Sequence, residues 1–136
     1  MDTRTAAEAV RGRLVGDSVE FLRVVTDSRA LQPGDLFVAL RGERFDGHDF
    51  VAAARSRGAV AAMVADDRVE GLAGNLIAVP DPLAALGTLA QFWRRKFPSP
   101  LIAVVGSNGK TTVKEMTAAI LRAHFGDDHV LATEGN

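Results

Sequence analysis

The chain has 136 residues, of which 47% are hydrophobic and 24% charged, a composition typical of a globular rather than a disordered protein. Sixteen basic and seventeen acidic side chains give a formal charge of −1, which argues against a surface for nucleic acid or anionic membranes. The absence of cysteine excludes disulfides and thiolate metal sites. No apolar run is long enough to span a membrane and the start lacks a signal-peptide core, so we expect a cytoplasmic protein with small-molecule partners.

Helix and strand patterns alternate along the first part of the chain. Residues 3–14 have the apolar spacing of a helix, Thr5 and Glu8 fit a capping box, and Gly16 ends the helix. Strand patterns occupy 19–28, 34–40, 59–65 and 75–81, and a helical pattern that ends at a glycine occupies 48–58. This alternation predicts an α/β fold, and residues 1–80 are assigned to a first domain.

A helix is expected to link this domain to a second one. Asp81 is placed to be its N-cap and Pro82 its first residue. The Pro-Ser-Pro sequence at 98–100 ends the helix, so residues 81–100 form the linking helix and the boundary, and residues 101–136 begin the second domain. One side of this helix is predicted to be apolar, with Leu83, Leu86, Leu89, Ala90 and Trp93.

The second domain begins with a strand pattern, a glycine-rich turn and a helical pattern. Residues 101–105 (LIAVV) predict the strand, and the turn is formed by residues 106–109. At the N-terminus of a helix, free backbone N–H groups and the positive end of the dipole attract phosphate, and glycines allow the backbone to approach the anion. The helix ends before Gly126, and its core-facing residues are expected to be Val113, Met116, Ile120 and Leu121.

Two side chains after the turn suit a nucleoside triphosphate with Mg²⁺. Lys110 would neutralise charge on the β- and γ-phosphates, and the Thr111 hydroxyl is placed to coordinate a phosphate-bound Mg²⁺. The segment is a shortened form of G-x-x-x-x-G-K-[ST], because Val104 stands where the motif has its first glycine. The alternative interpretation is a turn rich in Gly and Asn for conformational reasons alone.

These motifs resemble the bacterial Mur ligases of peptidoglycan synthesis, essentially from end to end of the chain. The matching segments are TDSRALQPGDLFVALRGERFDGHDF at 26–50, GSNGKTTVKEM at 106–116 and VLATEGN at 130–136. The resemblance implies three domains: an N-terminal one for the uridine diphosphate part of the substrate, a central ATPase, and a C-terminal one for the amino component. The chain matches the first of these and the first strand, P-loop and helix of the second.

The resemblance also implies an ATP-dependent amide ligase of cell wall biogenesis, and so of cell shape and cell division. In such ligases ATP phosphorylates a carboxylate of the nucleotide-linked peptide, and an amine attacks the acyl phosphate. VKEM at 113–116 and TEGN at 133–136 favour the ligase that joins D-alanyl-D-alanine to UDP-N-acetylmuramoyl-tripeptide, and the ligase that adds the third amino acid is the alternative. The full-length enzyme is expected to be a monomer.

Family positions supply the expected ATP and Mg²⁺ site. Lys110 is its catalytic residue and Thr111 its metal ligand, because Mg²⁺ and a lysine spread the charge that develops during phosphoryl transfer. Asn136 matches a family position near the substrate and the nucleotide. The nucleotide-binding set is Gly106, Ser107, Asn108, Gly109, Lys110, Thr111 and Thr112.

Two polar segments upstream suit a uridine nucleotide. The first follows a strand and the second precedes a helix; they consist of Thr26, Asp27, Ser28 and Arg29, and of Gly47 and His48. The alternative is structural: Asp27 and Ser28 would organise a turn, Arg29 would be a solvated charge, and Asp49 would cap the next helix.

Two hypotheses about activity remain. In the first, the chain is the N-terminal part of a ligase and binds ligands without ligating them, because no acidic strand end resembling a Walker B aspartate follows the loop. In the second, it is a non-catalytic module for a nucleotide or a nucleotide sugar. Further α/β sequence beyond Asn136 in the reading frame would favour the first.

Overall fold

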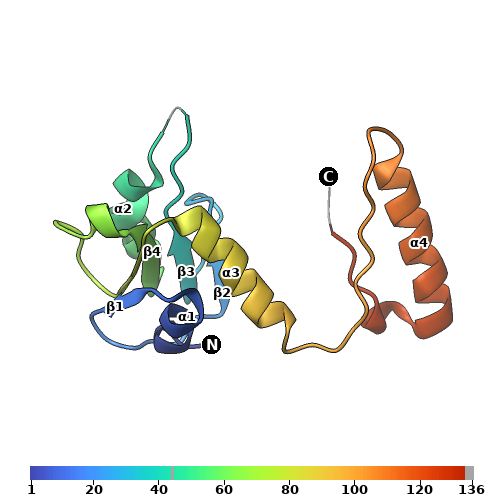
Figure 1. Ribbon diagram of the computed structural model, residues 1–136, viewed down its shortest axis with the longest axis horizontal. Coiled ribbons are helices and arrows are strands. Elements are labelled where there is room, and N and C mark those ends of the chain that lie inside the picture. Colours follow the sequence, from blue (N-terminus) through green and yellow to red (C-terminus); the bar gives the residue numbers. More distant parts are fainter. Residues whose placement is uncertain (44, 134–136) are drawn as a thin grey trace. The chain divides into compact units, whose positions relative to one another are not determined.

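A computed structural model describes residues 1–43 and 45–133, which fall into two compact units, one within Met1–Phe97 and one that begins at Pro98 (Figure 1). The first unit contains a five-stranded sheet in the order β1-β5-β4-β3-β2. Strands β2 to β5 are parallel and β1 is antiparallel to β5. The strands are β1 (Arg13–Val15), β2 (Arg23–Val25), β3 (Asp35–Val38), β4 (Ala61–Ala65) and β5 (Leu76–Val79).

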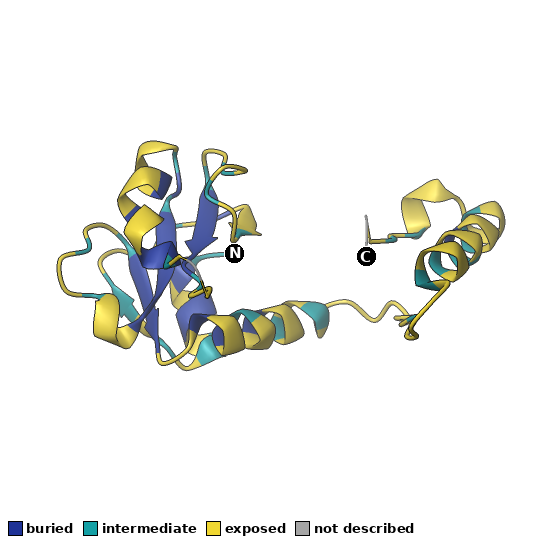
Figure 2. Cartoon of the chain, turned by 90° about the horizontal axis from the view of Figure 1, so that it is seen from above, coloured by how far each residue is buried: buried dark blue, intermediate teal, exposed yellow. Residues whose placement is uncertain are grey.

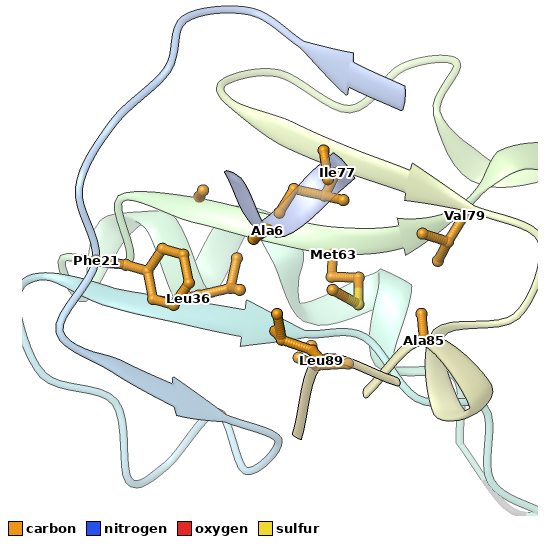
Figure 3. Close-up of a cluster of buried hydrophobic side chains, with 11 residues drawn as sticks. Ala6, Phe21, Leu36, Met63, Ile77, Val79, Ala85 and Leu89 are labelled. Carbon is orange, nitrogen blue, oxygen red and sulfur yellow. The ribbon is translucent and has the colours of Figure 1, made fainter. Parts of the chain in front are cut away.

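Helices pack on both faces of this sheet. Helices α1 (Thr3–Val10) and α3 (Pro82–Arg94) share one hydrophobic cluster with alternate residues of β3, β4 and β5, and α2 (Val51–Ser56) shares another with the intervening residues. Figure 3 shows the first cluster, in which Leu36, Met63 and Ile77 of the sheet lie among side chains of the two helices. The predicted α/β fold is confirmed for this unit, with all residues of β3, β4 and β5 buried (Figure 2).

The start of the chain differs from the prediction. Asp2, not Thr5, caps α1, because its carboxylate accepts a hydrogen bond from the Thr5 N–H at 2.9 Å. The helix ends at Val10, where Arg11 takes a left-handed conformation with φ of 55°. The residues predicted to complete the helix form β1 instead, because Arg13 to Val15 pair with β5, and this long-range pairing overrides local helical spacing.

Local signals placed α3 correctly. The Asp81 carboxylate accepts hydrogen bonds from the N–H groups of Leu83 at 2.8 Å and Ala84 at 3.3 Å, and Pro82 is the first helical residue. The predicted apolar side is only partly covered: Leu89 is buried, whereas Leu83 and Trp93 are exposed. No helix in the described ranges 1–43 and 45–133 is long and apolar enough to cross a membrane.

The second unit contains α4 (Lys110–Phe125) and a 3₁₀ turn (Asp127–His129), and α4 ends at Gly126 as predicted. The predicted strand at 101–105 is wrong for this chain, since no residue within 98–133 has strand structure. A strand needs a partner for its N–H and C=O groups, and the described part of this unit offers none.

The predicted core side of α4 also lacks a core. Val113, Met116 and Ile120 are exposed, and Ala118 is the one buried residue of the helix, as the predominantly exposed colouring of α4 shows (Figure 2). A cavity of about 680 Å³ lies against the helix, lined by Ala118, Leu121 and neighbouring apolar side chains of the same unit. The packing that would bury this helix is absent from the described residues, so its stability rests on local interactions.

Candidate functional site

The loop at residues 106–109 leads directly into α4. Gly109 is the N-cap, with φ of 74° and ψ of 1°, a left-handed conformation that strongly favours glycine. The Lys110 side chain folds back over the loop, where its ammonium group donates hydrogen bonds to the carbonyls of Gly106 at 3.0 Å and Ser107 at 3.4 Å. The lysine charge thus lies over the loop backbone, where a bound phosphate would meet it.

This geometry fits an anion. Gly109 has no side chain to accept hydrogen bonds from the first turn of the sixteen-residue α4, and the positive end of the helix dipole lies at the same place. Thr111 and Thr112 are exposed in that first turn. Within residues 1–43 and 45–133, no group of three or more His, Asp or Glu side chains is arranged to hold a metal. An Mg²⁺ ion here would therefore use Thr111 together with oxygens of the nucleotide.

The segment at residues 26–29 forms an exposed turn after β2. The Asp27 carboxylate accepts hydrogen bonds from the Arg29 backbone N–H at 2.9 Å and from its guanidinium at 2.8 Å. The Arg29 side chain and backbone hydrogen bonds lower the pKa of Asp27 to about 2. Arg57 donates to the Ser28 carbonyl at 2.8 Å, so the segment is tied to the end of α2. Its backbone is positioned by these contacts, and the Arg29 guanidinium remains exposed.

Gly47 and His48 both lie inside the fold. A Cβ atom at Gly47 would come within 2.7 Å of the Leu40 backbone, so only glycine fits without movement of the chain. His48 is 4% exposed; its Nε2 accepts a hydrogen bond from the Ala65 N–H at 2.9 Å, and its Nδ1 contacts the Asp46 carboxylate. The sequence predicted that His48 would line a polar pocket for a nucleotide. In the structure both ring nitrogens instead contact groups of the protein itself.

Asp46 is the centre of this region and was missed by the sequence analysis. Its carboxylate accepts from the His48 N–H at 3.0 Å and pairs with Arg68, and Arg41 Nε lies 3.7 Å away. Burial opposes ionisation of Asp46, but the hydrogen bonds from His48 and Arg68 outweigh it and keep the pKa of this carboxyl well below its usual range. The local signal was available in part, because an Asp directly before a helical turn is a common cap. Asp46 caps this turn, whereas the helix that Asp49 was expected to cap, α2, has Phe50 at its N-cap and no side-chain cap.

The predicted residues fall into separate groups. The segments at 26–29 and 46–48 belong to the first unit, and the loop at 106–112 belongs to the second. Asn136 lies outside the described residues.

The family model described as "Mur ligase family, catalytic domain" matches residues 20–94. The chain belongs to the Mur ligase family. This Mur ligase chain is 47% identical over 118 residues to UDP-N-acetylmuramoyl-tripeptide–D-alanyl-D-alanine ligase of Synechocystis, an alignment that covers 85% of the chain and 25% of the relative. The chain thus spans about a quarter of the length of this relative.

Solved structures agree with this family assignment. MurF from Acinetobacter baumannii superimposes with a TM-score of 0.77 and 35% identity, covering 88% of this Mur ligase chain and 27% of that protein. MurF ligase from Thermotoga maritima in complex with ADP has a TM-score of 0.66 and 36% identity, covering 74% of this chain and 23% of that one.

Proposed function

We propose that this chain supplies the nucleotide-substrate unit and the phosphate loop of an ATP-dependent ligase that joins D-alanyl-D-alanine to UDP-N-acetylmuramoyl-tripeptide in the cytoplasm. The observation that carries the proposal is the loop at 106–109, with Lys110 over its carbonyls and α4 behind it, in a chain 47% identical to a ligase of that name. Activation by ATP is needed because a free carboxylate is a poor acyl donor, whereas phosphate is a good leaving group.

The roles of the residues follow from their positions. Lys110 and the backbone at 106–112 hold the phosphates, and Thr111 offers its hydroxyl to Mg²⁺. Bound Mg²⁺ would supply further charge neutralisation during phosphoryl transfer. The first unit, which includes α3 and extends to Phe97, recognises the uridine diphosphate moiety through the segments at 26–29 and 41–50. By itself the chain binds ligands without joining them.

Uridine diphosphate should bind the chain saturably, as measured by isothermal titration. Arg29→Ala should raise the dissociation constant about tenfold, because the guanidinium, although paired with Asp27, is 86% exposed and keeps donors for a phosphate, and a charge-assisted hydrogen bond contributes about 1.5–3 kcal/mol. Arg4→Ala, a change of an exposed arginine on α1, is the matched control and should leave the constant unchanged. If wild-type protein shows no saturable binding, the first unit is not a uridine nucleotide site.

Lys110→Ala should weaken binding of ATP with Mg²⁺ by about tenfold to a hundredfold, since it removes one charge-assisted contact of about 1.5–3 kcal/mol. Titration followed by NMR suits the weak binding expected of the isolated loop. Lys96→Ala, which removes an exposed lysine in the first unit, is the control. Equal affinities of the Lys110→Ala and wild-type chains would make the loop a conformational turn only.

A further inference from the structure

The loop at residues 41–48 is tied at three points to the segment 65–68, which follows β4. The Ala65 N–H donates to His48 Nε2 at 2.9 Å. Arg41 donates through one nitrogen to both carboxylate oxygens of Asp67, at 2.8 and 2.9 Å. Arg68 pairs with the Asp46 carboxylate. We refer to these contacts together as the clamp, formed by Arg41, Asp46 and His48 with Ala65, Asp67 and Arg68.

His48 acts in the clamp as a link within the protein. Because Nε2 accepts a backbone N–H, the proton of the neutral ring is on Nδ1, where it is donated to Asp46. The ring is buried, so it has no free nitrogen or surface to offer to a ligand. The exposed aromatic side chains here are different ones: Phe45, 67% exposed, lies in the loop, and Phe50, 42% exposed, lies just after it at the end of the 3₁₀ turn Gly47–Phe50.

The charges of the clamp balance one another. Two arginines face two aspartates, and the four side chains occupy the loop after β3 and the turn after β4. Strands β3 and β4 are parallel neighbours, so their carboxyl ends lie at one edge of the sheet, where ligands of open α/β sheets bind. A neutral cluster of ion pairs at that edge supplies rigidity rather than an attractive field for an anion.

We propose that Asp46 and Arg68 are positioning residues for the uridine diphosphate moiety: they hold the loop at 41–48 in the conformation that presents the exposed rings of Phe45 and of the adjoining Phe50 to the nucleotide, without touching it themselves. The inference rests on the proposed function of the first unit. Flat aromatic rings suit a base, since stacking on them favours any nucleobase. The affinity for the nucleotide then depends on whether the loop is already ordered before binding, because a loop that must first become ordered binds its ligand more weakly.

The test compares Arg68→Ala, Arg68→Lys and the control Arg4→Ala in the 136-residue chain, with uridine diphosphate as the titrant. Arg68→Ala should raise the dissociation constant about tenfold, and Arg68→Lys should restore it to within about threefold, because Arg68 contacts Asp46 through a single nitrogen that a lysine can replace. The melting temperature should change little in both, since Arg68 is half exposed and the partly exposed Asp46 carboxylate keeps its contacts with His48. Ring ¹⁵N shifts of His48 should report the Nδ1-protonated form in wild-type protein, and the Nδ1 shift should change in Arg68→Ala, where the Asp46 acceptor has lost its arginine.

The possible outcomes distinguish failure of the positioning role from failure of the proposed uridine nucleotide site. Wild-type binding with unchanged affinity in Arg68→Ala would overturn the positioning role alone. An equal loss in Arg4→Ala, or no rescue by lysine, would show an effect of overall charge or of the arginine itself and would also overturn it. No binding by the wild-type chain would remove the proposed uridine nucleotide site, and the inference with it.

Discussion

The 136-residue chain should form no amide product when supplied with ATP, Mg²⁺, D-alanyl-D-alanine and UDP-N-acetylmuramoyl-tripeptide. Phosphoryl transfer and acyl transfer depend on holding the carboxylate, ATP and amine in register, and loss of that alignment forfeits most of a proximity advantage of about 7–11 kcal/mol. In the described part of the second unit the loop has no strand before it, and α4 has a single buried residue. We expect that such a loop cannot align three substrates.

The assay detects the product by mass, with the full-length Synechocystis relative as the positive control. We expect a rate at least about five orders of magnitude below that of the control, which corresponds to the lower part of the proximity advantage. Product formation by the chain at a rate comparable to the control would mean that the catalytic apparatus is already complete within these residues.

Arg23→Ala should lower the free energy of unfolding of the first unit by about 2 kcal/mol at neutral pH, since the arginine is half exposed but the Asp35 carboxylate that it pairs with is buried and would lose its charged partner. Asp35 is 1% exposed, and its carboxylate accepts from Arg23 Nε at 2.9 Å, from Arg23 Nη2 at 2.7 Å and from the Gln32 N–H at 2.7 Å. The pair joins β2 to β3. Arg13→Ala is a matched control, because Arg13 is also the exposed first residue of a three-residue edge strand.

The effect of Arg23→Ala should depend on pH. The Arg23 hydrogen bonds lower the pKa of Asp35, against the opposing effect of burial. A lowered folded-state pKa means that the stabilisation is fully present above the unfolded value of about 3.9 and is lost as the pH falls below it toward the folded value. Urea unfolding followed by circular dichroism should therefore show a large difference between variant and wild type at pH 7 and a smaller one at pH 3. A difference that is the same at both, or one matched by Arg13→Ala, would contradict this account of the ion pair.

Features with a local cause could be predicted from the sequence. Asp81 and Pro82 mark the start of α3, since a cap and a first-turn proline act through hydrogen bonds and dihedral angles of their immediate neighbours. Gly109 and Lys110 mark the loop before α4 for the same reason. The parallel strands β3, β4 and β5 were placed because fully buried strands appear as continuous apolar segments.

Features that depend on distant partners could not be predicted. The role of His48 is decided by the Ala65 N–H, which lies seventeen residues away in the sequence. Asp46 pairs with Arg68, which lies twenty-two residues away. Sequence spacing identified a polar segment there but could not tell a buried structural ring from an exposed ligand-binding one. The sheet edge at β1 was missed for a similar reason, because its pairing with β5 spans most of the first unit.

The sequence by itself determined the family, the α/β class and the glycine turn that starts α4, because these depend on contiguous residues whose conformations act over a few positions. Only the tertiary structure decided which polar residues face solvent, which arginine pairs with which carboxylate, and whether residues 101–105 form a strand. Each of these depends on backbone and side-chain groups from other elements. A strand pattern without a neighbouring strand has no hydrogen-bond partners, and so the same five residues that read as a strand in the sequence are not one in this chain.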